Sequence, residues 1–370
     1  MSLSKDQVVS EIEEGRCTLG IEYGSTRIKA VLDDSADQPI AVGTFDWENS
    51  LIDGYWTYSE KEIFDGLSAC YASLKADVKA KYGVKLTRLG ALGISAMMHG
   101  YLPFDNDGNL LVPFRTWRNA TTTQAASALT EIFAFHIPER WSIAHLYQAI
   151  LSGEQHVSKI SFFTTLAGFV HWRLTGKKVL SIGDASGMFP IDQKTKTYDA
   201  RMVSKFDTLE SVRRLGIKVE DLLPQVLLAG EKAGVLSEDG ARLLDTEGDL
   251  QAGCPLCPPE GDAGTGMIAT NSVAQRTGNV SAGTSVFSMV VLEHALKDQT
   301  VPAIDFVMTP DGNPVAMVHC NNCTSDINAW INLLKSYNDL MGFEVDTSGL
   351  YNKLFSGALD ADKKAGGLVR

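Results

Sequence analysis

Two strand–turn–strand segments, each with a turn made only of glycine, serine and threonine, constrain this sequence most. The first is centred on Gly24-Ser25-Thr26 and the second on Gly283-Thr284-Ser285. Small residues let backbone N–H groups approach an anion closely, and hydroxyl groups add further donors. A single turn of this kind is most often only a turn. Because one lies in each half of the chain, we expect a phosphate compound held between two α/β domains.

Size and charge set the class of protein. The chain has 370 residues, 44% of them hydrophobic and 21% charged, as expected for a soluble protein of two or three domains. The formal net charge of −12 disfavours a general nucleic-acid binder and adhesion to an anionic membrane. The first sixteen residues are polar, and no apolar run approaches the roughly 18 residues of a spanning helix. We therefore expect a cytoplasmic protein.

Periodicity places the main elements. A capping-box spacing, Ser59 to Glu62, precedes an amphipathic pattern over 59–81, which predicts a helix. The Asp105-Asn-Asp-Gly108 segment predicts the turn of a hairpin between 101–104 and 110–114. The other predicted elements are a helix over 4–15, strands over 17–23, 28–32 and 89–95, helices over most of 120–180 including 161–172, mixed structure over 200–250, two strands within 278–292, and a helix over 324–340 that begins near Thr324 or Ser325.

Asp262 lies just past a Pro/Gly/Cys-rich stretch at 253–261, which we interpret as a domain boundary. A carboxylate on a glycine-rich loop at such a boundary could accept the proton of an attacking hydroxyl group. The alternative is an ordinary helix N-cap, which Asp often provides. Both roles are compatible, because capping also orients the carboxylate.

Three further places carry polar side chains suited to a ligand. Glu22 ends a buried strand beside the first Gly-Ser-Thr turn, where a carboxylate next to phosphates implies Mg²⁺, directly or through water. Met98-His99-Gly100 follows the strand at 89–95, and Trp117-Arg118-Asn119 offers an aromatic face with polar donors that suits a sugar. The alternatives are a solvated strand end, a structural histidine and a surface loop.

Other patterns carry less weight. The pairs Cys254/Cys257 and Cys320/Cys323 could form a Cys₄ zinc site, but reduced thiols are the preferred interpretation. The GxGxxA match at 264–269 lacks the preceding strand of a dinucleotide-binding motif. The chain has no GxxxxGK[ST] motif, which disfavours a P-loop kinase.

Taken together and in order, five segments resemble the FGGY carbohydrate kinases, in particular the xylulokinases. They are Gly20-Ile-Glu-Tyr-Gly-Ser-Thr-Arg-Ile-Lys29, Gly93-Ile-Ser-Ala-Met-Met-His-Gly100, Pro113-Phe-Arg-Thr-Trp-Arg-Asn-Ala-Thr-Thr122, Arg173-Leu-Thr-Gly176 with Asp184-Ala-Ser-Gly187, and Gly261-Asp262 with Gly283-Thr-Ser285. The resemblance covers roughly residues 17–290. It implies an actin/hexokinase-like (ribonuclease H-like) two-domain α/β fold.

The resemblance also implies phosphoryl transfer from MgATP to a hydroxyl group of a small sugar or polyol, xylulose being the preferred substrate. Asp262 would be the general base and would contact the sugar. The implied sugar-binding residues are Met98, His99, Trp117, Arg118 and Asn119. The implied ATP-binding residues are Gly24, Ser25, Thr26, Lys29, Gly283, Thr284 and Ser285, with Glu22 toward Mg²⁺. A homodimer is implied only by this resemblance.

The resemblance divides the chain into an N-terminal extension at 1–16, an N-terminal kinase domain at 17–258 and the start of a C-terminal kinase domain at 259–370. The sequence departs from the family at Glu22, where the family usually has Asp. The family's later glycine-rich adenosine-binding block has no counterpart before Arg370, so we expect an incomplete second domain. A non-catalytic sugar- or nucleotide-binding protein derived from such a kinase is therefore the alternative.

Overall fold

The computed structural model describes residues 3–283, 286–294, 296–320 and 322–361. The chain divides into two compact units, one of residues 1–279 and 289–317 and the other of residues 280–288 and 318–370. Thr284 and Ser285, predicted to bind phosphate, lie outside the described residues.

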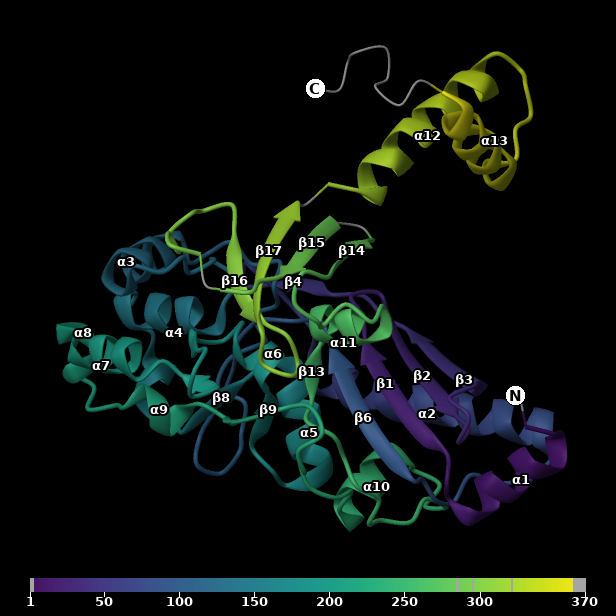
Figure 1. The fold of residues 1–370 in the computed structure, drawn as a ribbon, viewed down its shortest axis with the longest axis horizontal. Helices are drawn as coiled ribbons and strands as arrows, with labels where there is room; N and C mark the ends of the chain where they lie inside the picture. The colour runs from purple at the N-terminus through teal and green to yellow at the C-terminus, as the bar shows by residue number, and fades with distance from the viewer. Residues whose placement is uncertain (1–2, 284–285, 295, 321, 362–370) are drawn as a thin grey trace. The chain divides into compact units, whose positions relative to one another are not determined.

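A five-stranded mixed sheet forms the centre of the first unit, in the order β13-β6-β1-β2-β3 (Figure 1). Its strands are β1 (Thr18–Tyr23), β2 (Arg27–Asp33), β3 (Pro39–Asp46), β6 (Ala91–Ala96) and β13 (Glu260–Gly261). Strands β1, β2 and β3 form an antiparallel meander, whereas β6 runs parallel to both β1 and β13. The carboxyl ends of β1, β6 and β13 therefore meet at one edge of the sheet. The strands predicted over 17–23, 28–32 and 89–95 are confirmed.

Three helices cover one face of this sheet: α2 (Glu60–Tyr82), α5 (Leu166–Thr175) and α10 (Glu238–Leu244). Helix α2 packs against β2 and β3, α5 packs against β6, and α10 packs against both helices. The predicted capping box opens α2, because Ser59 Oγ accepts from the Glu62 N–H at 3.2 Å and the Ser59 N–H donates to Glu62 Oε2 at 2.7 Å.

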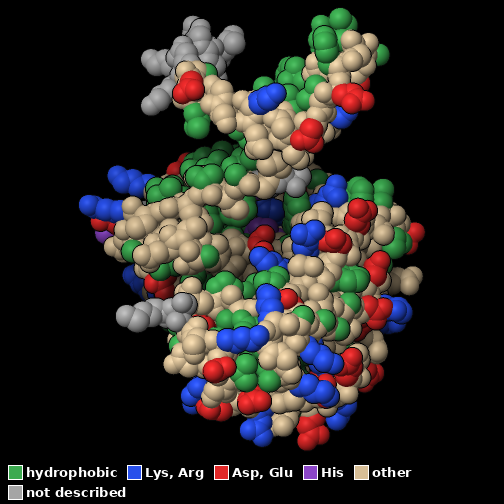
Figure 2. Space-filling model, turned by 90° about the vertical axis from the view of Figure 1, so that its right-hand side faces the viewer, with side chains coloured by type: hydrophobic (Ala, Val, Ile, Leu, Met, Phe, Trp, Pro, Cys, Tyr) green, Lys and Arg blue, Asp and Glu red, His purple; other side chains and the backbone are tan. Residues whose placement is uncertain are grey.

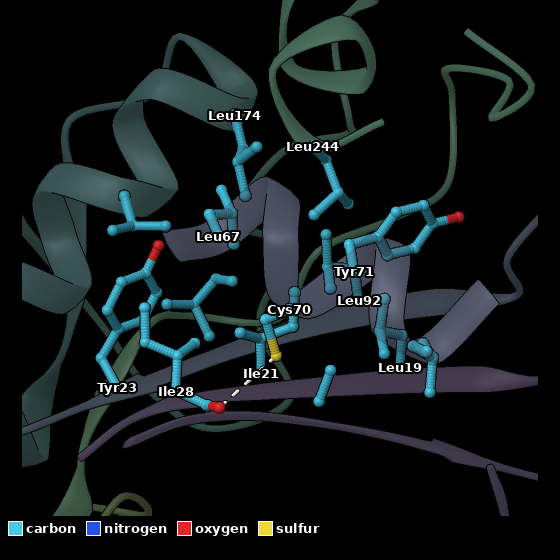
Figure 3. Close-up of a cluster of buried hydrophobic side chains, with 14 of the residues drawn as sticks. Leu19, Ile21, Tyr23, Ile28, Leu67, Cys70, Tyr71, Leu92, Leu174 and Leu244 are labelled. Carbon is cyan, nitrogen blue, oxygen red and sulfur yellow. Dashed lines mark hydrogen bonds between the residues drawn. The ribbon is translucent and has the colours of Figure 1, made fainter. Parts of the chain in front are cut away.

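The hydrophobic core lies between the sheet and these helices (Figure 3). Along β1, Leu19, Ile21 and Tyr23 are buried, while Gly20 and Glu22 alternate onto the opposite face. Figure 3 shows the buried β1 side chains packed against α2, where Cys70 Sγ donates to the Ile28 carbonyl at 3.5 Å. Each large apolar side chain buried in this way contributes about 1.5–3 kcal/mol to stability. Since the apolar side chains of β1 occupy the core face, the opposite face, which carries Glu22, is available for a functional site.

The hairpin predicted between 101–104 and 110–114 forms in part. The Asp105 turn is present, with the Gly108 N–H donating to the Asp105 carbonyl at 3.1 Å, and isolated antiparallel bridges join Phe104 to Leu110 and Tyr101 to Arg115, without a continuous strand over 110–114. The other edge of β7 (Leu102–Phe104) pairs antiparallel with β8 (Phe162–Thr164), a segment predicted as helix. Phe162 and Phe163 are buried in this pairing, and the helix α5 begins only after Thr165. Burial against a distant strand therefore overrides the local helical periodicity.

The rest of the first unit is mainly helical, as predicted for 120–180. Its other elements are α1 (Lys5–Glu14), β4 (Ser50–Ile52), β5 (Tyr55–Thr57), α3 (Thr123–Phe133), α4 (Ser142–Leu151), the 3₁₀ helix at Gln155–Lys159, β9 (Val179–Ser181), α6 (Ile182–Ala185), β10 (Ile191–Asp192), β11 (Thr197–Tyr198), α7 (Ala200–Thr208), α8 (Glu210–Arg213), α9 (Val219–Leu222), β12 (Gln225–Leu227), α11 (Asp262–Ala269) and β16 (Asp305–Met308). Strands β9 and β12 pair in parallel.

A second sheet has the order β14-β15-β17-β16, with β14 (Gly278–Ala282), β15 (Val286–Val291) and β17 (Pro314–Cys320). The second unit contains the helices α12 (Thr324–Leu340) and α13 (Thr347–Asp360). The helix predicted over 324–340 is confirmed, but its N-cap is Cys323 without a side-chain cap. Thr324 Oγ1 donates instead to the Gly283 carbonyl at 2.8 Å.

Two further observations concern one face of the surface and the described helices. On the face drawn in Figure 2, acidic and basic side chains are interspersed over the surface. Among the described helices, none is both long enough and apolar enough to cross a bilayer.

Candidate active site

Two aromatic side chains donate hydrogen bonds to the backbone of the turn between β1 and β2. Trp47 Nε1 donates to the Gly24 carbonyl at 2.8 Å, and the Tyr58 hydroxyl donates to the Ser25 carbonyl at 2.6 Å. Trp47 and Tyr58 are buried and stacked, with ring centroids 4.0 Å apart. Within the described part of the chain, the backbone N–H groups of Ser25 and Thr26 form no hydrogen bond. A turn with two bonded carbonyls and two available N–H donors fits a phosphate group.

The open face of the sheet beside this turn carries few side chains. Gly20 on β1 and Gly93 on β6 contribute none, while Glu22 and Lys29 are exposed on neighbouring strands. Glu22 pairs in register with Lys29, which places opposite charges across from each other. A carboxylate and an ammonium group beside a phosphate-binding turn suit a magnesium–phosphate ligand.

Asp262 begins α11 directly after β13, with Gly261 as the N-cap residue. Asp262 Oδ1 accepts from the Met98 N–H at 3.1 Å and from the Ala263 N–H at 2.9 Å. Burial raises the pKa of this carboxyl to about 6, the two N–H groups oppose the rise, and the charge of Glu22 adds to it. Asp262 is thus a partly buried carboxyl near Glu22, with a pKa close to neutrality.

Met98 and His99 form a sharp turn after β6. His99 has φ 72° and Gly100 has φ 93°, so two consecutive residues adopt the left-handed region. The His99 ring is buried, stacks on Trp141 with centroids 6.5 Å apart, and has Nδ1 3.4 Å from the Gly187 carbonyl oxygen. A Cβ on Gly187 would lie 2.6 Å from Nδ1, so only glycine leaves room for this ring. Strained backbone of this kind is concentrated at functional sites.

Two buried carboxyls lie beside Asp262. Glu260 is 5% exposed, and Ser181 Oγ and the Gly261 N–H both donate to it, the latter at 2.8 Å. Asp184 is fully buried and accepts from Thr165 Oγ1 at 2.6 Å. Burial, followed by the charge of Glu260, raises the pKa of Asp184 well above its usual range, and burial raises the pKa of Glu260 to about 7.

The remaining predicted sugar-binding residues form a wall beside the first turn. Trp117 Nε1 donates to Ser25 Oγ at 3.3 Å, while Arg118 lies over the Trp56 ring, 4.2 Å from its centroid. The Asn119 side chain is buried and bonded to the backbone of Trp56, with Oδ1 accepting from the N–H at 2.8 Å. Asn119 therefore holds the β4–β5 hairpin against this wall.

The sequence predictions come together in part. In the first unit, Gly24, Ser25, Thr26, Lys29 and Glu22 surround one sheet edge with Met98 and Asp262. Gly283 lies in the second unit and is exposed. Sequence reasoning gave no role to Asp184, Glu260, Tyr58 or Trp141. The available signals were the family-like segment that begins at Asp184 and the position of Glu260 two residues before Asp262.

The cysteine pairs belong to different units, Cys254/Cys257 to the first and Cys320/Cys323 to the second. Over residues 3–361, apart from the undescribed positions, no group of three or more His, Cys, Asp or Glu side chains is arranged to hold a metal ion. Burial raises the pKa of Cys254 to about 11, which favours an unreactive thiol.

Comparison with known proteins identifies the family. Residues 17–248 match the sequence model of the N-terminal domain of the FGGY family of carbohydrate kinases. A glycerol kinase of Thermococcus kodakarensis is 23% identical over 290 residues, which are 74% of this chain and 53% of the relative. The chain thus spans about half the length of this curated relative.

Solved structures agree on the fold. The xylulose kinase of Rhodospirillum rubrum aligns with a TM-score of 0.74 at 17% identity, over 94% of this chain and 68% of that one. The glycerol kinase of Plasmodium falciparum with ADP aligns with a TM-score of 0.67 at 15% identity, over 86% and 64%. The chain belongs to the FGGY family of carbohydrate kinases. The predicted α/β fold of the actin/hexokinase-like type is confirmed.

Proposed function

We propose that this protein transfers the γ-phosphoryl group of MgATP to a hydroxyl group of a small sugar or polyol, with Asp262 as the general base. The observation that carries the proposal is the Asp262 carboxyl itself. It lies at the carboxyl end of β13, near Glu22, and is oriented by the Met98 and Ala263 N–H groups. A pKa of about 6 lets it be ionised at neutral pH and still accept a proton as the new bond forms.

The residues at the β1–β2 turn fit the phosphates of ATP. The unbonded N–H groups of Ser25 and Thr26 are suited to phosphate oxygens, with Lys29 as a nearby cation. Glu22 is suited to Mg²⁺ or its bound water. When bound, Mg²⁺ neutralises charge that develops on the phosphates. The predicted roles of Gly24, Gly283, Thr284 and Ser285 at the phosphates are part of this proposal.

The sugar is proposed to lie against the turn at Met98 and His99. In the reaction, a sugar oxygen forms its bond to the γ-phosphorus as the bond to ADP breaks, and the hydroxyl proton passes to Asp262. Trp117 and Arg118 are proposed as further contacts, and Asn119 as the residue that fixes their wall. Because the similar proteins include xylulose and glycerol kinases, we propose a small ketose or polyol, with xylulose first.

ADP release from MgATP with a panel of ketoses and polyols tests the proposal. We expect turnover with at least one member, and a loss of about 10³-fold or more in kcat for Asp262→Ala with an unchanged circular dichroism spectrum. Asp65→Ala, at an exposed carboxylate on α2, is the matched control and should retain turnover. Wild-type protein that forms no ADP with any member contradicts the proposal.

A binding measurement distinguishes the kinase from the alternative, a non-catalytic sugar- or nucleotide-binding protein. The measurement is calorimetry with xylulose and with MgATP. Sugar binding without ATP binding or turnover favours a sugar-binding protein, whereas binding of both with ADP formation favours the kinase.

A further inference from the structure

The carboxyl of Glu260, two residues before Asp262, occupies a space left by the absence of side chains at Gly183 and Gly264. A Cβ on Gly183 would lie 2.6 Å from both Glu260 oxygens, and a Cβ on Gly264 would lie 2.7 Å from Glu260 Cδ. Any other residue at either position would push this carboxyl out of place. Glycine at these two positions thus leaves room for the Glu260 side chain between the backbone of α6 and that of α11.

Glu260 joins the turn before Asp262 to the start of α6. Its carboxyl accepts from the Gly261 N–H and from the Ser181 hydroxyl. The backbone N–H groups of Gly183 and Asp184 also favour its charged form. Four donors from two segments therefore converge on one side chain. If that side chain moves, Gly261 loses its link to α6, and Asp262 is the next residue.

Asp184 lies on the other side of the same turn. Its Oδ2 accepts from Thr165 Oγ1, and a Cβ on Gly261 would lie 3.3 Å from its Oδ1. The His99 N–H favours the charged form, but among the described residues no donor completes a hydrogen bond to Oδ1. A fully buried oxygen without a donor is costly as an anion, whereas a protonated carboxyl avoids that cost.

We propose that Glu260 and Asp184 are positioning residues: packed against Gly183, Gly264 and Gly261, they fix the backbone from which the Asp262 carboxyl projects. The proposal rests on the proposed function. The fixed backbone keeps the Asp262 carboxyl on the Met98 and Ala263 N–H groups, in the position proposed for accepting the substrate proton. Burial raises the pKa of both buried carboxyls, and the charge of Glu260 raises the pKa of Asp184 further.

Ionisable groups from several described elements lie around the pair, including the buried His99 ring against Gly187. Asp262 on α11 and the backbone of His99 face Asp184, Asp184 raises the pKa of Tyr198, and Glu260 raises the pKa of Cys257. Strand β16 packs against α6, and its Asp305 is paired with Arg140 and His136.

Two neutral variants test the proposal in the full chain. Glu260→Gln keeps the shape but not the charge, and we expect kcat about tenfold lower, KM for MgATP within about twofold, and a pH–rate profile without its ionisation near pH 7. Asp184→Asn mimics a protonated carboxyl, and we expect a profile like that of the wild type. Glu11→Gln, at another buried carboxylate, is the matched control.

A stability measurement gives a second readout that needs no turnover. The folded protein holds a proton on Glu260 up to about pH 7, and the unfolded chain releases it near 4.5. Stability from this group is therefore lost as pH rises through about 7, and Glu260→Gln should shrink the Tm difference between pH 5.5 and 8.5 by about 4 °C. The Glu11→Gln variant should keep the wild-type difference.

The outcomes separate the two proposals. An active wild type whose pH profile and pH-dependent Tm are unchanged in Glu260→Gln overturns the positioning role alone. An Asp184→Asn variant that shifts the profile as far as Glu260→Gln does overturns the neutral state expected of Asp184. A wild type that forms no ADP overturns the proposed function, and the catalytic part of this inference fails with it.

Discussion

Replacing Asp262 by asparagine should make the protein more stable while removing the proposed kinase activity. In the folded chain the Asp262 pKa is about 6, against an ordinary value of 3.8. At about 1.36 kcal/mol for each pKa unit, the ionised carboxyl costs the folded state about 3 kcal/mol at pH 8. In Asp262→Asn the amide oxygen would keep the acceptor for the Met98 and Ala263 N–H groups, so we expect a net gain of about 1–3 kcal/mol.

The gain should depend on pH in a defined direction. The folded state retains its proton up to about pH 6 and the unfolded chain loses it near 3.8, so wild-type stability falls as pH rises between these values. The variant lacks this group, and the difference should be near zero at pH 4 and full above pH 7. Urea unfolding at pH 5 and pH 8 measures it, alongside ADP release. An Asp262→Asn protein less stable than the wild type at pH 8, or a difference that does not change with pH, refutes the reasoning.

Three other substitutions test the scaffold. Tyr71→Phe removes a buried hydroxyl that has no hydrogen-bond partner in the described part of the chain, so we expect about 0.5–1.5 kcal/mol of stabilisation by urea unfolding. Lys75 Nζ lies 2.9 Å from the buried Asp245 carboxylate, and Lys75→Met removes this cation, so we expect the free energy of unfolding to fall by about 3–5 kcal/mol. An unchanged free energy of unfolding would show that this ion pair does not stabilise the fold. Tyr58→Phe removes the hydroxyl that holds the Ser25 carbonyl, and should raise KM for MgATP a few-fold with little change in Tm; an unchanged KM would separate Tyr58 from the phosphate turn.

The first half of the candidate site could be predicted because its signals are local. The Gly24 turn, the capping box at Ser59 and the strand before Met98 are each written in a few adjacent residues. Alternation along β1 also fixes which face carries Glu22, since Leu19, Ile21 and Tyr23 must be buried. Asp262 was predicted from its place on a glycine-rich loop, and the structure adds the strand that precedes it.

Other parts depended on contacts between distant residues. Residues 162–164 become a strand because Phe104 and its neighbours on β7 offer a partner about sixty residues away, which periodicity over a short window does not register. The fit of the Glu260 carboxyl against Gly183 likewise arises only when β13 is brought beside α6.

The amino-acid sequence by itself determined the turn at Gly24–Thr26 that is proposed to bind phosphate, the sheet that carries it, the core face of that sheet and the carboxylate proposed as the base. Only the tertiary structure decided the chemistry of that carboxylate. Burial raises the pKa of Asp262, and two groups far away in the sequence act on it as well: the Met98 N–H opposes the rise and the charge of Glu22 adds to it.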